Sequence, residues 1–387
     1  MGKQYISTGT AAEAHSLDIL DLVITARYTL TVSSDGYAAF WDNKQEENHD
    51  PHQYVKRILI NKMGLHHVST YEAVLPSSHV KVLLMAFAAF DGSITLKLIV
   101  GDDFETLKEI PVPVDLRKDC WGPCFHQDPE SKQDYFVATK IGKGAIAYRL
   151  DITSPDGSNV EVLLDEYGHL VGSNGAFPNS IDISNSTEAK VAIGHSNGDV
   201  LLYDLETLKP YYTFRSTDLQ QTTTGAHGSS SIARVVKFSP GGSMLAVARD
   251  NQSSGSITLY DVKYGEDVGS LTTPSHSSKT TIGGFAHDGW VMGLCFDETG
   301  DLLASSGFDK CVRIWNLDTR EREATISISV SDLESTDGNE ELDTSVASGV
   351  KFIKKGIRSG SGGDTNEGLC VVSFDRGIRW YREAGGI

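Results

Sequence analysis

The stretch AHDGWVMGLCFDETGDLLASSGFDKCVRIWNLDT, residues 286–319, contains three short apolar runs separated by turn residues. The runs cover residues 291–296, 302–306 and 311–315, and the third is rich in β-branched and aromatic side chains, which favour strands. A fourth run at 323–329 follows a further turn. The stretch therefore predicts one four-stranded antiparallel sheet of roughly 40 residues.

A single sheet of this size cannot cover both of its faces, so it needs similar sheets packed against it. Counting six residues from the turn before the third strand gives equivalent positions at Trp41, Lys97, Arg149, Tyr203, Tyr260, Trp315 and Tyr381. Successive positions are 56, 52, 54, 57, 55 and 66 residues apart. The sequence therefore predicts seven repeats, with those near Lys97 and Arg149 the weakest, in a single all-β domain that covers residues 1–387.

The N-terminus carries one isolated strand candidate, residues 3–8, which lacks the three partners of a complete sheet. The final repeat, residues 346–384, has room for only three strands. We therefore expect the N-terminal strand to pair with the strand that ends at Tyr381 and to close a ring of sheets. Closure also removes exposed sheet edges, which promote aggregation.

Composition limits the functions that the chain can have. It has 34 basic and 52 acidic residues, a net charge of −18, which disfavours direct nucleic-acid binding because that affinity comes mainly from neutralised phosphates. The N-terminus lacks a secretory layout, and the longest apolar run, residues 82–90, is too short to cross a membrane. Five cysteines, an odd number, indicate a reduced intracellular protein.

Two groups of residues raise the possibility of a metal site. Cys120 and Cys124 are followed by His126, but a structural zinc site needs four ligands and no second pair lies nearby in the sequence. His66 and His67 are adjacent on a predicted strand and should point to opposite faces, one buried and one exposed. We therefore expect neither a metal nor a cofactor.

Polar segments connect the repeats, and the one at residues 331–348 contains six acidic side chains. This composition cannot support a core, so we expect a solvated acidic loop that is dispensable for folding, with a binding role as the alternative.

The repeats resemble those of the WD-repeat β-propeller family, whose third strands end in Trp-Asp. In that family a His, a Ser or Thr, an Asp and a Trp of one blade form a buried hydrogen-bond chain. The matching positions are His287, Ser305, Asp309 and Trp315 in the clearest repeat and His15, Asp35 and Trp41 in the first. The other repeats lose one or more members, so we expect their packing to depend on apolar contacts.

A His-Ser-Asp trio also occurs in hydrolases, where a carboxylate orients the histidine that activates the serine. A serine on a strand facing a tryptophan is, however, typical of buried structure. We therefore expect a protein without enzymatic activity and without catalytic residues, and a propeller hydrolase is the least favoured alternative.

The C-terminal half narrows the resemblance further. Residues 280–292, 350–356 and 374–386, together with 35–37 and 64–68 near the front, closely resemble the family of WD-repeat subunits of superkiller complexes. The resemblance implies a non-enzymatic subunit that assembles with an RNA helicase and a tetratricopeptide-repeat scaffold and assists the cytoplasmic exosome in 3′-to-5′ mRNA decay. In fungi it also implies a nuclear role in meiotic recombination, through the double-strand-break transesterase. The alternative is another WD-repeat adaptor, such as a chromatin or ubiquitin-ligase substrate reader.

A group of aromatic residues predicts where a partner binds. Three repeats place a phenylalanine directly before the turn aspartate, and two further aromatics precede first strands; with a nearby acidic residue, the predicted binding residues are Phe90, Phe177, Trp290, Phe308, Phe374 and Asp18. In WD-repeat propellers these positions lie on the top face near the channel. We expect them to bind a short apolar segment of the scaffold with an arginine attracted by Asp18. The alternative is that each phenylalanine packs between blades as core.

Overall fold

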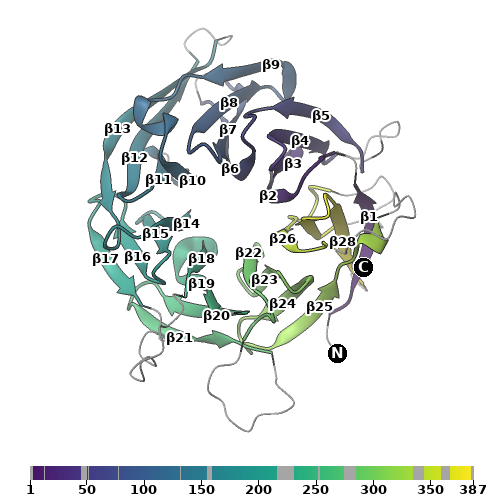
Figure 1. The fold of residues 1–387 in the computed structure, drawn as a ribbon. Helices are drawn as coiled ribbons and strands as arrows, with labels where there is room; N and C mark the ends of the chain where they lie inside the picture. The colour runs from purple at the N-terminus through teal and green to yellow at the C-terminus, as the bar shows by residue number, and fades with distance from the viewer. Residues whose placement is uncertain are drawn as a thin grey trace.

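The computed structural model describes residues 3–384 except 13, 45–49, 51, 77, 131, 155–158, 216–230, 252, 274–284, 334–343 and 359–366. The described residues form 28 strands in seven four-stranded antiparallel sheets. Figure 1 shows the sheets arranged as the blades of a ring, with the first strand of each nearest the centre. The predicted seven-bladed propeller is therefore confirmed, including the weak second and third repeats.

Each of the first six blades contains four strands that are consecutive in the sequence. The first strand lies nearest the centre of the ring and the fourth lies at the rim. Blades 1 to 3 are β2 (Ile19–Ile24), β3 (Tyr28–Ser33), β4 (Tyr37–Asp42), β5 (Tyr54–Leu59); β6 (Leu65–Val74), β7 (Lys81–Ala89), β8 (Ile94–Val100), β9 (Asp103–Ile110); and β10 (Cys120–His126), β11 (Asp134–Lys140), β12 (Gly144–Thr153), β13 (Glu161–Val171). Blades 4 to 6 are β14 (Pro178–Ile183), β15 (Lys190–His195), β16 (Val200–Asp204), β17 (Pro210–Phe214); β18 (Ala233–Phe238), β19 (Met244–Asn251), β20 (Ser254–Asp261), β21 (Glu266–Leu271); and β22 (Val291–Phe296), β23 (Leu302–Gly307), β24 (Cys311–Asn316), β25 (Arg322–Ser327).

Blade 7 is built from both ends of the chain. It contains β26 (Ala347–Phe352), β27 (Leu369–Ser373) and β28 (Ile378–Glu383), and its outermost strand is β1 (Tyr5–Ala11). β1 runs antiparallel to β28, with Tyr5 opposite Glu383 and Ala11 opposite Ile378. The predicted closure is therefore confirmed, although the strand begins two residues later and ends three residues later than expected.

A buried polar cluster supports this closure. Glu367 of blade 7 accepts hydrogen bonds from Thr8 Oγ1 of β1, at 2.8 Å, and from the guanidinium of Arg358. The Nε2 atom of His52, which lies between β4 and β5 of blade 1, is 3.3 Å from the same carboxylate. One buried side chain thus connects the N-terminal strand, the first blade and the last.

The core lies between the blades. The second and third strands of most blades are almost entirely buried because neighbouring sheets cover both of their faces. At the closing junction the indoles of Trp41 and Trp380 meet at 6.3 Å between ring centroids. Each large apolar side chain removed from water in this way stabilises the fold by about 1.5–3 kcal/mol.

The hydrogen-bond chain of blade 6 has all four members in contact. His287 Nε2 lies 2.7 Å from Ser305 Oγ and its Nδ1 lies 2.9 Å from Asp309, while Trp315 Nε1 donates to Ser305 Oγ at 2.9 Å. Burial favours a raised pKa for Asp309, but hydrogen bonds from His287 and Arg313 outweigh it and lower the pKa to about 2. Ser305 is fully buried and held on both sides, so it cannot reach a substrate as a nucleophile.

In blade 1 the chain of hydrogen bonds is shorter. His15 Nε2 lies 2.8 Å from Thr31 Oγ1, and His15 Nδ1 lies 3.2 Å from Asp35. The indole nitrogen of Trp41 is buried and has no hydrogen-bond partner among the described residues. Its ring still packs against His15, with the centroids 6.4 Å apart.

The remaining blades pack through apolar contacts, as expected, and in three of them a buried cation is present in addition. In blade 5, Arg249 donates to the carbonyls of Gly198 and Phe214 in blade 4. In blade 7, Arg379 donates to Asp375 at 2.6 Å, and in blade 3, Lys140 donates to two carbonyls of the preceding loop. These cations fix the turns by satisfying backbone and carboxylate oxygens that burial removes from water.

The predicted acidic loop lies mostly outside the described residues, since 334–343 are not among them. Its C-terminal boundary was placed too late, because β26 already begins at Ala347. The described helices are single 3₁₀ turns, such as η1 (Val114–Arg117) and η4 (Val330–Asp332). Within the described part of the chain, no helix has the length and apolar character that a membrane crossing requires.

Candidate protein-binding face

The innermost strand of every blade carries one extra residue near its start. The register against the second strand shifts between the same two positions in all seven blades, for example between Ile19 and Asp21 in β2 and between Leu65 and His67 in β6. The residues at these bulges are Leu20, His66, Trp121 with Gly122, Asn179, Arg234, Met292 and Ser348. A bulge redirects side chains and locally ends regular pairing, which is common beside functional sites.

All seven innermost strands enclose the central channel, a cavity of about 550 Å³. The bulge residues line this channel at the end where the innermost strands begin. Six of the seven junctions between neighbouring innermost strands have, among the described residues, a hydrogen bond between a side chain of one strand and the backbone of the other. Asp21, for example, accepts from Val68 N at 3.0 Å, and Ser180 Oγ donates to Ala233 O at 3.0 Å. These bonds hold the strands around the mouth in fixed positions.

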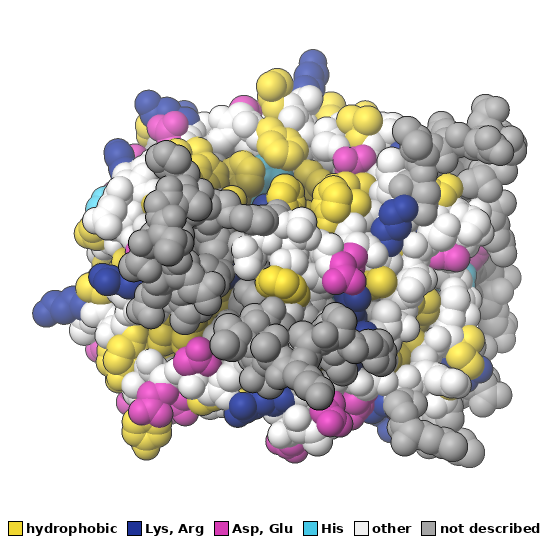
Figure 2. All heavy atoms as spheres, turned by 60° about the horizontal axis from the view of Figure 1, so that its bottom comes forward, with side chains coloured by type: hydrophobic (Ala, Val, Ile, Leu, Met, Phe, Trp, Pro, Cys, Tyr) yellow, Lys and Arg dark blue, Asp and Glu magenta, His cyan; other side chains and the backbone are white. Residues whose placement is uncertain are grey.

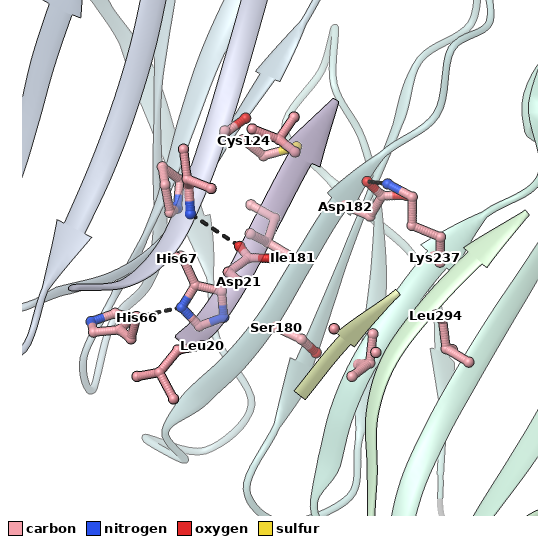
Figure 3. Close-up of a pocket in the computed structure, with 18 of the residues that line it drawn as sticks. Leu20, Asp21, His66, His67, Cys124, Ser180, Ile181, Asp182, Lys237 and Leu294 are labelled. Carbon is pink, nitrogen blue, oxygen red and sulfur yellow. Dashed lines mark hydrogen bonds and ion pairs between the residues drawn. The ribbon is translucent and has the colours of Figure 1, made fainter. Parts of the chain in front are cut away.

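The bulge in β6 overturns the prediction for the two adjacent histidines. His66 is buried and His67 is half-buried, and their Nδ1 atoms lie 2.6 Å apart. The extra residue breaks the strict alternation on which the prediction rested, so both rings turn to the same side, as Figure 3 shows. Burial, followed by the charge of His67, lowers the pKa of His66 to about 3, and burial also lowers the pKa of His67.

His66 is the centre of the first aromatic cluster. Its ring stacks on Trp121 with centroids 3.9 Å apart and an interplanar angle of 20°. Phe90 contacts His66 at 4.9 Å and Phe177 contacts Trp121 at 5.1 Å, again between centroids. Two predicted residues, Phe90 and Phe177, are therefore brought together by two residues that the sequence analysis did not assign to the face. We call Phe90, His66, Trp121 and Phe177 the Trp121 cluster.

A second group, which we call the Trp290 cluster, consists of Trp290, Phe308 and Phe374. Phe308 lies 5.6 Å from Trp290 and 6.4 Å from Phe374, measured between centroids. The guanidinium of Arg234, a bulge residue, lies 4.8 Å above the ring of Trp290 and also binds Asp250. The five predicted aromatics thus form two clusters on different blades rather than one.

Exposure distinguishes the residues available to a partner from those that support them. Phe90 and Phe308 each expose 46% of their surface and Trp290 exposes 39%, whereas Phe177 and Phe374 are half-buried. Figure 2 shows hydrophobic side chains gathered beside a histidine in the upper part of that view. Exposed aromatics supported by buried ones are typical of protein-binding surfaces.

Asp18 is exposed at the junction of blades 1 and 7. Partial burial raises the pKa of its carboxyl, and the charge of Arg376 opposes that rise. Asp18 thus lies on the side of Phe374, where a cation of the protein itself is already close. An incoming arginine would share this carboxylate with Arg376 or displace it.

The cysteines give no indication of a metal centre. Cys120 is buried and its Sγ lies 3.4 Å from the carbonyl oxygens of Asp115 and Lys118. All five thiols are free. Among the residues that the structure describes, no group of three or more His, Cys, Asp or Glu is placed to hold a metal ion.

Comparison with known proteins gives three useful matches. Residues 278–316 match the family described as WD domain, G-beta repeat. The whole chain is 36% identical to the antiviral protein SKI8 of Saccharomyces cerevisiae, over 416 aligned positions that cover all of both proteins. It is 25% identical to the meiotic recombination protein rec14 of Schizosaccharomyces pombe, over 69% of this chain and 74% of that protein.

Proposed function

Because this chain belongs to the WD-repeat family that includes the antiviral protein SKI8, we propose that it is a non-catalytic scaffold subunit of the superkiller complex. In this role it assists the cytoplasmic RNA exosome in degrading messenger RNA from the 3′ end. The observation that carries the proposal is the 36% identity over the full length of both proteins, which includes every blade of this chain.

The partners that we propose are the tetratricopeptide-repeat scaffold subunit and the RNA helicase subunit of that complex. The top face supports this proposal because its two aromatic clusters border the channel mouth and the bonded inner strands hold them rigidly. A rigid face loses little conformational entropy on binding. The exposed aromatics Phe90, Trp290 and Phe308 serve as the anchors, and Asp18 receives an arginine of the bound segment.

A second role, in meiotic recombination, is supported by the similarity to the meiotic recombination protein rec14. We propose that the same face binds the double-strand-break transesterase in the nucleus. Since one face cannot hold two segments in the same place, the two partners would exclude one another.

The main alternative, a chromatin or ubiquitin-ligase substrate reader, predicts other companions. The test is to purify the tagged full-length chain from its own cells and to identify the proteins that accompany it by mass spectrometry. We expect an RNA helicase and a tetratricopeptide-repeat protein in comparable amounts. Recovery of histones or of ubiquitin-ligase subunits in their place would contradict the proposal and favour the alternative.

A variant links this test to the proposed face. Trp290→Ala should remove both partners from the purified sample. Tyr264→Ala is the matched control, because Tyr264 is a large aromatic that exposes 62% of its surface yet belongs to neither cluster. If both variants retained the partners, the complex would assemble through another surface.

A further inference from the structure

The channel has a second cavity at its other end. It has a volume of about 580 Å³ and lies at the C-terminal ends of the innermost strands of blades 4 to 7, whereas the aromatic clusters lie at their N-terminal ends. Both cavities are lined by Asp182, Ile183 and Lys237, so they are neighbours. The floor of the second cavity includes Phe238 and Phe296, which end β18 and β22.

Four lysines border this end of the channel, in a protein whose net charge is −18. Lys237 and Lys351 occupy equivalent positions in blades 5 and 7, each two residues beyond the register shift of its strand. Lys354 and Lys355 come after Ile353, just beyond β26, and line the second cavity together with Lys237, whereas Lys351 lines the neighbouring central channel. A local gathering of cations against an overall acidic background is the electrostatic signature of an anion site.

The carboxylates nearby already have partners. Asp182 accepts from Lys237 Nζ at 2.7 Å and from the backbone N–H of Phe238 at 2.8 Å. Figure 3 shows this pair on the side of the channel opposite His66 and His67. Although burial favours a lowered pKa for Lys237, the charge of Asp182 outweighs it and raises the pKa, so the ammonium stays protonated.

The two other carboxylates that line the second cavity, those of Asp297 and Glu298, also have polar partners. Asp297 accepts from the backbone N–H groups of Gly300, at 2.9 Å, and Leu302, at 3.0 Å, within its own turn. Glu298 lies 3.8 Å from Lys354 Nζ. Within the described ranges, Lys351 and Lys355 have no carboxylate within ion-pair distance.

The ammonium groups of Lys237 and Lys351 both influence the thiol of Cys124. Burial, with the charge of Asp182, raises the pKa of the Cys124 thiol to about 12, and the charges of Lys237 and Lys351 oppose this rise. Two ammonium groups from blades 5 and 7 are thus close enough to influence one thiol on blade 3. Asp182 neutralises Lys237, so Lys351 is the cation of this pair that an anion would balance.

From these charges and their arrangement we propose that the lower end of the channel binds a small phosphate-bearing anion, held by Lys351 and Lys355 with Lys237 beside it. A phosphate anion supplies the ion-pair partner that Lys351 and Lys355 lack. The apolar floor gives a larger phosphorylated molecule a surface against which to pack, and the volume is within the usual range for small-molecule sites. This site is independent of the function proposed above, because it lies at the other end of the channel.

The proposal is tested by isothermal titration calorimetry of the purified full-length chain, with inorganic phosphate and tripolyphosphate as probes and chloride at matched ionic strength. We expect saturable binding with one site per chain. The Lys351→Gln/Lys355→Gln double variant should weaken it at least tenfold. The control is Lys209→Gln/Lys263→Gln, which removes two exposed lysines from the outer parts of blades 4 and 5 and should bind as wild type does.

Equal affinity for the two probes would identify free phosphate as the ligand, and tighter binding of tripolyphosphate would identify a molecule with several phosphates. The absence of saturable binding, or an equal loss in the control, would overturn the proposal. If the double variant fails to fold, the single variant Lys355→Gln, at an exposed position, gives the same comparison. Partner recovery by the double variant should equal that of wild type, which separates this site from the top face.

Discussion

The guanidinium of Arg358 lies over the indole of Trp380, 4.6 Å from the ring centroid, inside the blade that closes the ring. Both side chains are fully buried, and Arg358 is paired with Glu367. A buried arginine is tolerated when a carboxylate and an aromatic face replace its water. The closing blade therefore depends on Glu367 to neutralise Arg358.

Removing Glu367 should accordingly destabilise the ring far more than removing a surface ion pair. We expect Glu367→Ala to lower the free energy of unfolding by about 3–5 kcal/mol, because it leaves a buried charge without its partner. Lys3→Ala is the control, since it breaks only the exposed pair with Glu383 and should cost about 1 kcal/mol or less. Denaturant unfolding measures the loss of unfolding free energy in both variants. Equal losses would show that the buried contacts of Glu367 stabilise the closing blade no more than the exposed ion pair does.

Deleting residues 1–10 removes most of β1 and exposes the edge of β28. We expect the melting temperature to fall by several degrees, because five of the six paired positions and the Thr8 contact with Glu367 are lost. A deletion of residues 1–3 leaves β1 intact and should have little effect. Differential scanning fluorimetry compares the two, and an unchanged melting temperature in the longer deletion would contradict a stabilising role for closure by β1.

His66 should make stability depend on pH. The unfolded chain takes up a proton at this residue near pH 6.5, whereas the folded protein does so only near pH 3. Its pKa is therefore depressed in the folded state, and stability falls as the pH decreases from about 6.5 towards 3, by up to about 1.4 kcal/mol per pH unit. In His66→Gln the plot of unfolding free energy against pH should be shallower over that range.

The slope is the informative quantity, because His66→Gln also loses the stacking on Trp121 and so changes stability at every pH. Four other histidines, His67, His126, His195 and His287, have lowered pKa values and keep part of the slope in the variant. A variant slope equal to that of wild type would show that His66 titrates normally.

The exposed aromatics should contribute to binding and little to stability. Phe308→Ala or Trp290→Ala should weaken binding of the scaffold segment at least tenfold, a loss of about 2 kcal/mol or more, with the melting temperature nearly unchanged. Phe177→Ala should lower both the affinity for the scaffold segment and the melting temperature, because Phe177 is half-buried against Trp121. Wild-type affinity in both of the first two variants would exclude this face, and a large loss of stability in them would favour the core alternative.

The repeat pattern predicted the architecture because blade geometry depends on features that occur seven times. Even the weak repeats near Lys97 and Arg149 kept the spacing of the third strand, and β8 and β12 include those residues. The closing strand was predictable because the last repeat has only three strand candidates and each sheet needs four. The exact ends of β1 were not predictable, because pairing with β28 sets them rather than the local sequence.

The candidate binding face was predicted less completely because it depends on the bulges, which leave no periodic signal. Trp121 lies in a Cys-Trp-Gly-Pro-Cys stretch. The sequence analysis considered its two cysteines as metal ligands and did not assign the indole between them to the binding face. The two histidines were misassigned for the same reason, since strict alternation fails at an inserted residue. The buried cations Arg249, Arg379 and Lys140 were missed because a strand pattern alone does not show that a charged side chain will find buried acceptors.

The closure of blade 7 by β1 has a consequence for how the protein is made. β1 leaves the ribosome about 370 residues before its partner β28, a delay of roughly 20–70 seconds at a synthesis rate of about 5–20 residues per second. Blades 1 to 6 can form as they emerge, but the ring stays open until β28 has been synthesised. A nascent chain therefore carries an unpaired β1 until then, and a product that lacks β28 cannot complete the last sheet.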